Sequence, residues 1–191
     1  MKEVKRCSWV PKNLPLYIKY HDKEWGKPIK NSKKLFEMLC LEGAQAGLTW
    51  WTVLQKRENY RKAYDNFDPV KIAKYTDKKQ EKLLQNSGII RNRLKVNAFR
   101  ENARAYLEIE KEFGSFSKYI WSFADGKQIQ NKFKSLKEIP ATTKISDAMS
   151  KDLKKRDFKF VGPTICYAFM QAVGMVNDHE VGCFIYGKFN R

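Results

Sequence analysis

Apolar residues recur at helical spacing along most of the chain, and this periodicity restricts the fold more than any other feature of the sequence. Capping residues or proline precede the apolar runs, and glycines follow several of them. No alternating pattern typical of a strand persists, and residues 125–145 are expected to be irregular. The sequence therefore predicts an all-α fold, and 191 residues suit a single domain spanning 1–191. We expect helices to begin near Ser32, Thr49, Asp68, Asp77, Asn92, Ser115, Ser146 and Pro163, and glycine to end them at Gly43, Gly88, Gly114 and Gly174.

The net charge of the sequence indicates which class of partner the protein binds. The 38 Lys and Arg residues against 21 Asp and Glu give a formal net charge of +17, which favours a polyanion, with nucleic acid as the first candidate. The alternative is a lysine-rich composition that merely keeps the chain in solution. No apolar run approaches the roughly 18 residues of a membrane span, and no apolar stretch of a secretory signal follows the basic N-terminus. We expect a cytoplasmic protein with no membrane partner.

The segment 158–164 follows one expected helix, opens another and contains Gly162. Glycine lets a backbone come close to a phosphate, and the free amides at the start of the next helix can then hold it. The segment therefore suits the hairpin of helix-hairpin-helix DNA-binding proteins, or else an ordinary glycine-containing junction between helices. Nearby lysines would add attraction that does not depend on base sequence: Lys151, Lys154, Lys155 and Lys159.

The cysteines and histidines suggest a metal site. Cys40 and Cys166 lie in apolar helical runs, which is typical of buried thiols. The remaining candidates for a closed, tetrahedral zinc site would join segment 7–21 to segment 179–183: Cys7, His21, His179 and Cys183. His179 and Cys183 are four residues apart, so one helical turn can present both. The spacing is not that of a zinc finger, so the residues alone also allow incidental polar side chains or a Cys7–Cys183 disulfide.

Aromatic residues concentrate in the first 51 positions, and Glu42 lies among them, after an apolar helix and before a glycine-rich turn. One interpretation is a carboxylate at a helix end beside a tryptophan-rich core. The other is a pocket with aromatic walls and one hydrogen-bond acceptor, which suits a flipped, positively charged base. The aromatic residues concerned are Trp9, Tyr17, Tyr20, Trp25, Trp50 and Trp51.

Several longer motifs occur in one order over nearly the whole chain and together resemble the DNA-3-methyladenine glycosylase I family. They are Arg6-Cys7-Ser8-Trp9, Tyr20-His21-Asp22-Lys23-Glu24-Trp25-Gly26, Leu35-Phe36-Glu37-Met38, Leu41-Glu42-Gly43, Ala46-Gly47-Leu48-Thr49-Trp50, Phe158-Lys159-Phe160-Val161-Gly162 and Val176-Asn177-Asp178-His179. The resemblance implies a helix-hairpin-helix glycosylase fold and one structural zinc ion per chain, held at Cys7, His21, His179 and Cys183. It also implies a base pocket at Tyr20, Trp25, Glu42 and Trp50, with Trp9 nearby.

What the resemblance implies for activity is excision of 3-methyladenine from double-stranded DNA by a monomeric, monofunctional hydrolase that then releases the free base. Glu42 would be the catalytic carboxylate, and Lys159 and Gly162 would contact DNA. Leu48 or Gln45 would fill the gap in the duplex unless both pack internally. Asp178 is interpreted as a neighbour of a zinc ligand without a catalytic role.

Two other classes of protein remain. One is a non-enzymatic, zinc-containing helix-hairpin-helix module that only binds DNA, against which the carboxylate among aromatic rings argues. The other is a zinc-dependent hydrolase, but catalytic zinc needs an open coordination position and a closed four-ligand site leaves none.

Overall fold

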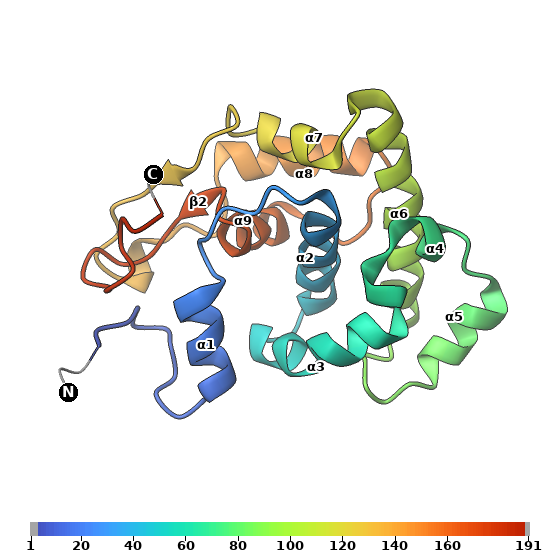
Figure 1. The fold of residues 1–191 in the computed structure, drawn as a ribbon, viewed down its shortest axis with the longest axis horizontal. Coiled ribbons are helices and arrows are strands. Elements are labelled where there is room, and N and C mark those ends of the chain that lie inside the picture. The colour runs from blue at the N-terminus through green and yellow to red at the C-terminus, as the bar shows by residue number, and fades with distance from the viewer. Residues whose placement is uncertain (1–3, 190–191) are drawn as a thin grey trace.

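The computed structural model describes residues 4–189, and that part of the chain is mainly helical, as the periodicity predicted (Figure 1). None of its helices is long and apolar enough to cross a membrane. The α-helices are α1 (Pro15–Lys23), α2 (Ser32–Gln45), α3 (Trp50–Ala63), α4 (Pro69–Ala73), α5 (Asp77–Leu84), α6 (Arg93–Phe113), α7 (Phe116–Ser122), α8 (Lys144–Lys155) and α9 (Pro163–Ala172). The short elements are the 3-10 helices η1 (Asp65–Phe67) and η2 (Leu136–Glu138) and the strands β1 (Ile129–Gln130) and β2 (Val176–Asn177).

Side-chain caps explain where most of these helices begin. Thr49, Asp68 and Asn92 each accept a hydrogen bond from a backbone N–H in the first turn of α3, α4 and α6. The cap of α8 corrects the sequence prediction, because Thr143 is the N-cap and Ser146 is the third helical residue, whose hydroxyl completes a capping box.

Helix α1 was not predicted, because its first turn has no side-chain cap: Leu14 precedes Pro15 there. The strands β1 and β2 were also missed. They pair in parallel, Ile129 with Val176, but two residues are too few to show alternation.

Gly43 does not end α2, contrary to the sequence prediction; the helix continues to Gln45. The glycine instead permits a close helix-to-loop approach. A Cβ atom at this position would lie 3.1 Å from Cβ and 3.2 Å from the carbonyl oxygen of Phe160. Gly43 thus lets the middle of the molecule pack against the 156–162 loop that joins α8 to α9.

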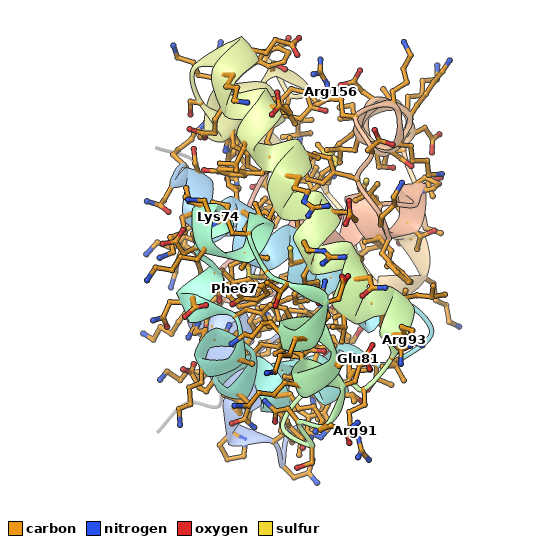
Figure 2. The ribbon with its side chains drawn as sticks, turned by 90° about the vertical axis from the view of Figure 1, so that its right-hand side faces the viewer. Phe67, Lys74, Glu81, Arg91, Arg93 and Arg156 are labelled. Carbon is orange, nitrogen blue, oxygen red and sulfur yellow. The ribbon has the colours of Figure 1, made fainter. Side chains whose placement is uncertain are left out.

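Helix α2 lies at the centre of the molecule and contacts α3, α6, α7 and α9, while α8 packs along α9 (Figure 1). The long helix α6 crosses one face, where ion pairs secure both of its ends (Figure 2). Arg93 pairs with Glu81 at its start, and Arg156 pairs with Glu112 near its end. Both terminal segments lie at the opposite end of the molecule, where the backbone N–H of Phe184 donates to the carbonyl of Lys5 over 2.9 Å.

Candidate active site

A cavity of about 330 Å³ opens beside the C-terminal half of α2. Glu42 lies on its wall together with five of the six aromatic residues that the sequence analysis grouped with it, all but Trp51, so the structure brings these predicted pocket residues together. The lining residues are Trp9, Tyr17, Tyr20, Trp25, Glu42, Gln45, Trp50, Leu136, Ile139, Ala168 and Gln171.

The aromatic walls come from three separate segments that pack on one another. Trp9 meets Trp25 edge to face, with ring centroids 4.9 Å apart, and Tyr20 of α1 lies 5.3 Å from Trp50 at the start of α3. The indole N–H of Trp50 is buried without a hydrogen-bond partner in the described residues. A buried donor without a partner is unfavourable for the folded protein.

Glu42 supplies the carboxyl group among the residues that line the cavity, and only 3% of its surface is exposed. No residue in the described part of the chain offers it a hydrogen bond or an ion pair. Burial therefore raises the pKa of the Glu42 carboxyl from 4.5 to about 8, because the ionised form loses its hydration and gains no partner. The side chain is thus a neutral acid near neutral pH that a cationic ligand would drive towards ionisation.

The terminal segments bring three candidate metal ligands together. The ligand atoms of Cys7, His21 and Cys183 all lie within 4.8 Å of one another, and all three side chains are buried. The neighbouring Cys7 thiol lowers the pKa of Cys183. His21 Nδ1 is 2.8 Å from an oxygen of Asp22, which leaves Nε2 directed at the Cys183 sulfur, 3.6 Å away. Both cysteines are free thiols.

His179 adjoins this cluster. Its ring centroid is 5.0 Å from that of His21, and its Nδ1 lies 2.7 Å from Asn177 Oδ1. That contact fixes Nδ1 as the donor, so the lone pair is on Nε2, which is buried and has no partner among residues 4–189. Burial lowers the pKa of His179 to about 4, which keeps the ring neutral, as a metal ligand must be. The group whose ligand atoms all lie within 4.8 Å of one another thus consists of Cys7, His21 and Cys183, and His179 lies beside that group.

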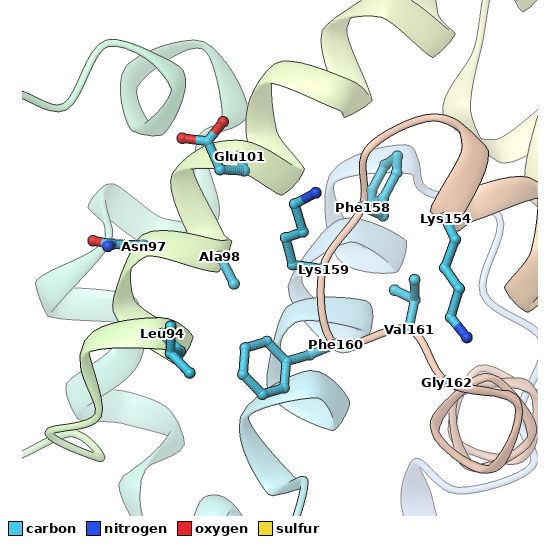
Figure 3. Close-up of a pocket in the computed structure, with 10 residues that line it drawn as sticks. All are labelled: Leu94, Asn97, Ala98, Glu101, Lys154, Phe158, Lys159, Phe160, Val161 and Gly162. Atoms are coloured by element: carbon cyan, nitrogen blue, oxygen red, sulfur yellow. The ribbon is translucent and has the colours of Figure 1, made fainter.

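The 156–162 loop and the start of α6 enclose a second groove of about 640 Å³ (Figure 3). Asn102 of α6 holds the loop at both backbone polar groups of Lys159. Its side chain accepts from the Lys159 N–H over 2.7 Å and donates to the Lys159 carbonyl over 3.1 Å. Lys159 and Gly162 line this groove and are absent from the lining of the Glu42 cavity. Leu48, 42% exposed, lines neither, whereas Gln45 lines the cavity.

Two residues that organise these sites escaped the sequence analysis. Gln171 lines the Glu42 cavity although it lies in an otherwise apolar helix. Asn102 is buried on the packed face of α6. A polar residue inside an apolar helical stripe is the signal for both, because buried amides are kept where they have a partner.

Comparison with known proteins gives consistent results. The family model described as methyladenine glycosylase matches residues 9–186. The chain is 56% identical to DNA-3-methyladenine glycosylase 1 of Escherichia coli (strain K12) over 183 residues, covering 96% of this chain and 97% of that protein. It is 54% identical to DNA-3-methyladenine glycosylase of Haemophilus influenzae, covering 93% of this chain and 96% of that one.

Solved structures agree with these sequence matches. A crystal structure of a 3-methyladenine DNA glycosylase I superimposes with a TM-score of 0.93 at 56% identity, covering 95% of this chain and all of that one. The enzyme from Staphylococcus aureus, whose structure describes 3-methyladenine recognition, superimposes with a TM-score of 0.92 at 36% identity, covering 95% of this chain and 96% of that one.

Proposed function

The chain belongs to the methyladenine glycosylase family, and we propose that the cavity around Glu42 is where it binds 3-methyladenine and cleaves its N-glycosidic bond. Its activity is that of a DNA-3-methyladenine glycosylase, a hydrolase of DNA repair. The observation that carries the assignment of the site is a buried carboxyl without a protein partner, enclosed by aromatic rings.

Charge recognition explains why such a cavity suits this base. Methylation at N3 gives the adenine ring of the nucleotide a positive charge, and aromatic faces attract cations. A cationic ring also stabilises the ionised form of Glu42, which the protein alone disfavours. Unmethylated adenine carries no such charge, so the same cavity gains less from it. Glu42 therefore helps to select the lesion by electrostatics.

The positive charge of the methylated base also reduces the rate acceleration that the protein must supply. A cationic base is a good leaving group, so excluding water from the flipped nucleotide and holding the departing base supply much of what the reaction requires. Lysine is not among the residues that line the described cavity, and we infer that water is the nucleophile. The enzyme would then be monofunctional and would leave the strand intact.

We propose that the α8–α9 connection is a helix-hairpin-helix motif that binds the DNA backbone. Gly162 is the N-cap of α9 and Pro163 has no N–H, so the amides that are free to meet a phosphate are the next two of the first turn, those of Thr164 and Ile165. Lys154 and Lys159 line the adjacent groove and add positive charge (Figure 3). Leu48 is the better candidate to fill the gap in the duplex, because it is exposed, whereas Gln45 faces the cavity. The unit that acts is one domain, 1–191, as a monomer in the cytoplasm.

We propose zinc as the ion for the site of Cys7, His21, His179 and Cys183. Its role is structural, because four protein ligands leave no position open for water or substrate. The ion would join the N-terminal segment to the C-terminal one, where the backbone of Ser8 also donates to the Glu180 carboxylate.

Chromatography of the bases released from methylated duplex DNA tests the proposed function. The wild-type protein should release 3-methyladenine, and Glu42→Gln should release it more slowly. Binding of the duplex without release of any base would support the non-enzymatic alternative and overturn the proposal.

A further inference from the structure

Resting on the proposed function, we propose that Gln171 contacts the flipped base and selects the adenine ring, and that Asp178 is the positioning residue that orients its amide. Gln171 lies in the last turn of α9 and lines the cavity that contains Glu42. Asp178 follows β2, lies outside the cavity lining and has no exposed surface. Asp178 accepts a hydrogen bond from Gln171. The proposed chemistry does not otherwise use this buried carboxylate, and the contact gives it a role.

Hydrogen bonds fix which end of the Gln171 amide faces the protein. The Asp178 carboxylate is surrounded by donors: Tyr167 Oη at 2.6 Å, Asn131 Nδ2 at 2.7 Å and Gln171 Nε2 at 2.8 Å. A carboxylate only accepts hydrogen bonds, so the amide nitrogen of Gln171 must point to it. The side-chain carbonyl oxygen has no hydrogen-bond partner in the described part of the chain, and it remains available as an acceptor.

The chemistry of the base then determines what this oxygen can recognise. On a nucleotide methylated at N3, the ring nitrogens of adenine have no hydrogens to donate, and the 6-amino group is the strong donor on the ring. A hydrogen-bond acceptor on the cavity wall therefore either accepts from the 6-amino group or faces the lone pairs of the ring nitrogens. Guanine-type bases carry a carbonyl at the same ring position, which would oppose the Gln171 oxygen, and leaving buried polar groups opposed strongly disfavours a ligand.

Selection thus divides between two sets of residues. The aromatic walls and Glu42 respond to the charge that methylation creates, whereas Gln171 responds to the ring. Unmethylated adenine has the same amino group as the lesion. Gln171 therefore contributes to the preference for 3-methyladenine over 3-methylguanine and leaves the preference over adenine unchanged.

Competition between free bases, measured by calorimetric titration, tests this division. Gln171→Met keeps the length of the side chain but removes the acceptor, and it should lower affinity for 3-methyladenine roughly three- to tenfold, as expected for one neutral hydrogen bond. Its preference over 3-methylguanine should fall by at least that factor, while its preference over adenine stays. Gln55→Met, at an exposed position of α3, is the matched control and should bind like the wild type.

The role of Asp178 needs a second variant with a readout other than stability. Asp178→Asn can donate to the Gln171 oxygen, which frees the amide to turn, so its preference over 3-methylguanine should also fall. Adding Gln171→Met to Asp178→Asn should then change the preference little further, because both act on one contact. An unchanged preference in Gln171→Met, or fully additive effects in the double variant, would overturn the proposal. Failure of the wild type to release 3-methyladenine would instead refute the proposed function.

Discussion

Burial of Glu42 predicts that replacing it stabilises the protein increasingly as pH rises. The folded chain holds the pKa of this carboxyl at about 8, against 4.5 as its ordinary value. Between these values Glu42 is protonated when folded and ionised when unfolded. The folded state therefore binds one more proton, and the stability that Glu42 contributes is lost as pH rises towards 8. Glu42→Gln removes this dependence.

The magnitude follows from the two pKa values. At about 1.4 kcal/mol for each pKa unit, the cost of keeping Glu42 folded grows by about 3 kcal/mol from about pH 5 to about pH 8. The free energy of unfolding of Glu42→Gln, relative to the wild type, should rise by that amount over the same interval. The cost of burying the new amide does not change with pH, so it cancels when two pH values are compared. The comparison therefore reports only the pH-dependent part of the free energy of unfolding.

Urea unfolding at a series of pH values measures the difference. Glu108→Gln is the control, since Glu108 is an exposed residue of α6 paired with Lys111, and it reports the loss of one surface carboxylate. A gap between wild type and Glu42→Gln that stays constant with pH would refute the reasoning, because it would mean that the cavity accommodates an ionised Glu42 without cost.

Three other predictions concern the metal, the DNA and the aromatic wall. Purified protein should contain one zinc ion per chain, and His179→Ala should lower both zinc content and the melting temperature; metal-free protein of wild-type stability would contradict the site. Affinity for undamaged duplex should fall steeply with salt, and Lys159→Glu should weaken all sequences alike in anisotropy titrations, whereas a flat salt response would exclude backbone binding. Trp50→Ala should weaken binding of free 3-methyladenine by calorimetry through lost stacking, and undiminished affinity would remove Trp50 from the pocket.

The parts of the fold that could be predicted from the sequence are those that local signals mark. Asn92 and Gly114 bracket α6 because capping and left-handed termination are properties of single residues. Gly43 misled the prediction, because a glycine that permits contact with Phe160 has the same local pattern as one that ends a helix. Helix α1 lacks a capping side chain, so no local signal marked where it begins.

The candidate site was predictable where residues cluster along the chain. Tyr20, Trp25 and Glu42 lie close in sequence, and the cavity collects them. Gln171 comes from a distant helix and reaches the same cavity only through the packing of α9 on α2, which no local pattern encodes. The orientation of its amide depends on Asp178, which the sequence marked only as a neighbour of His179.

The central claim is that an aromatic cavity with one buried acid recognises the methylated base by charge. Near neutral pH Glu42 holds a proton that free 3-methyladenine, a stronger base than adenine, can accept, which creates an ion pair inside the cavity. Calorimetric titration of wild type and Glu42→Gln with both bases tests this directly. The wild type should prefer 3-methyladenine, and Glu42→Gln should lose roughly tenfold to a hundredfold in affinity for it, as expected for one charge-assisted hydrogen bond. Equal binding of both bases by the wild type, or full discrimination by Glu42→Gln, would contradict the account.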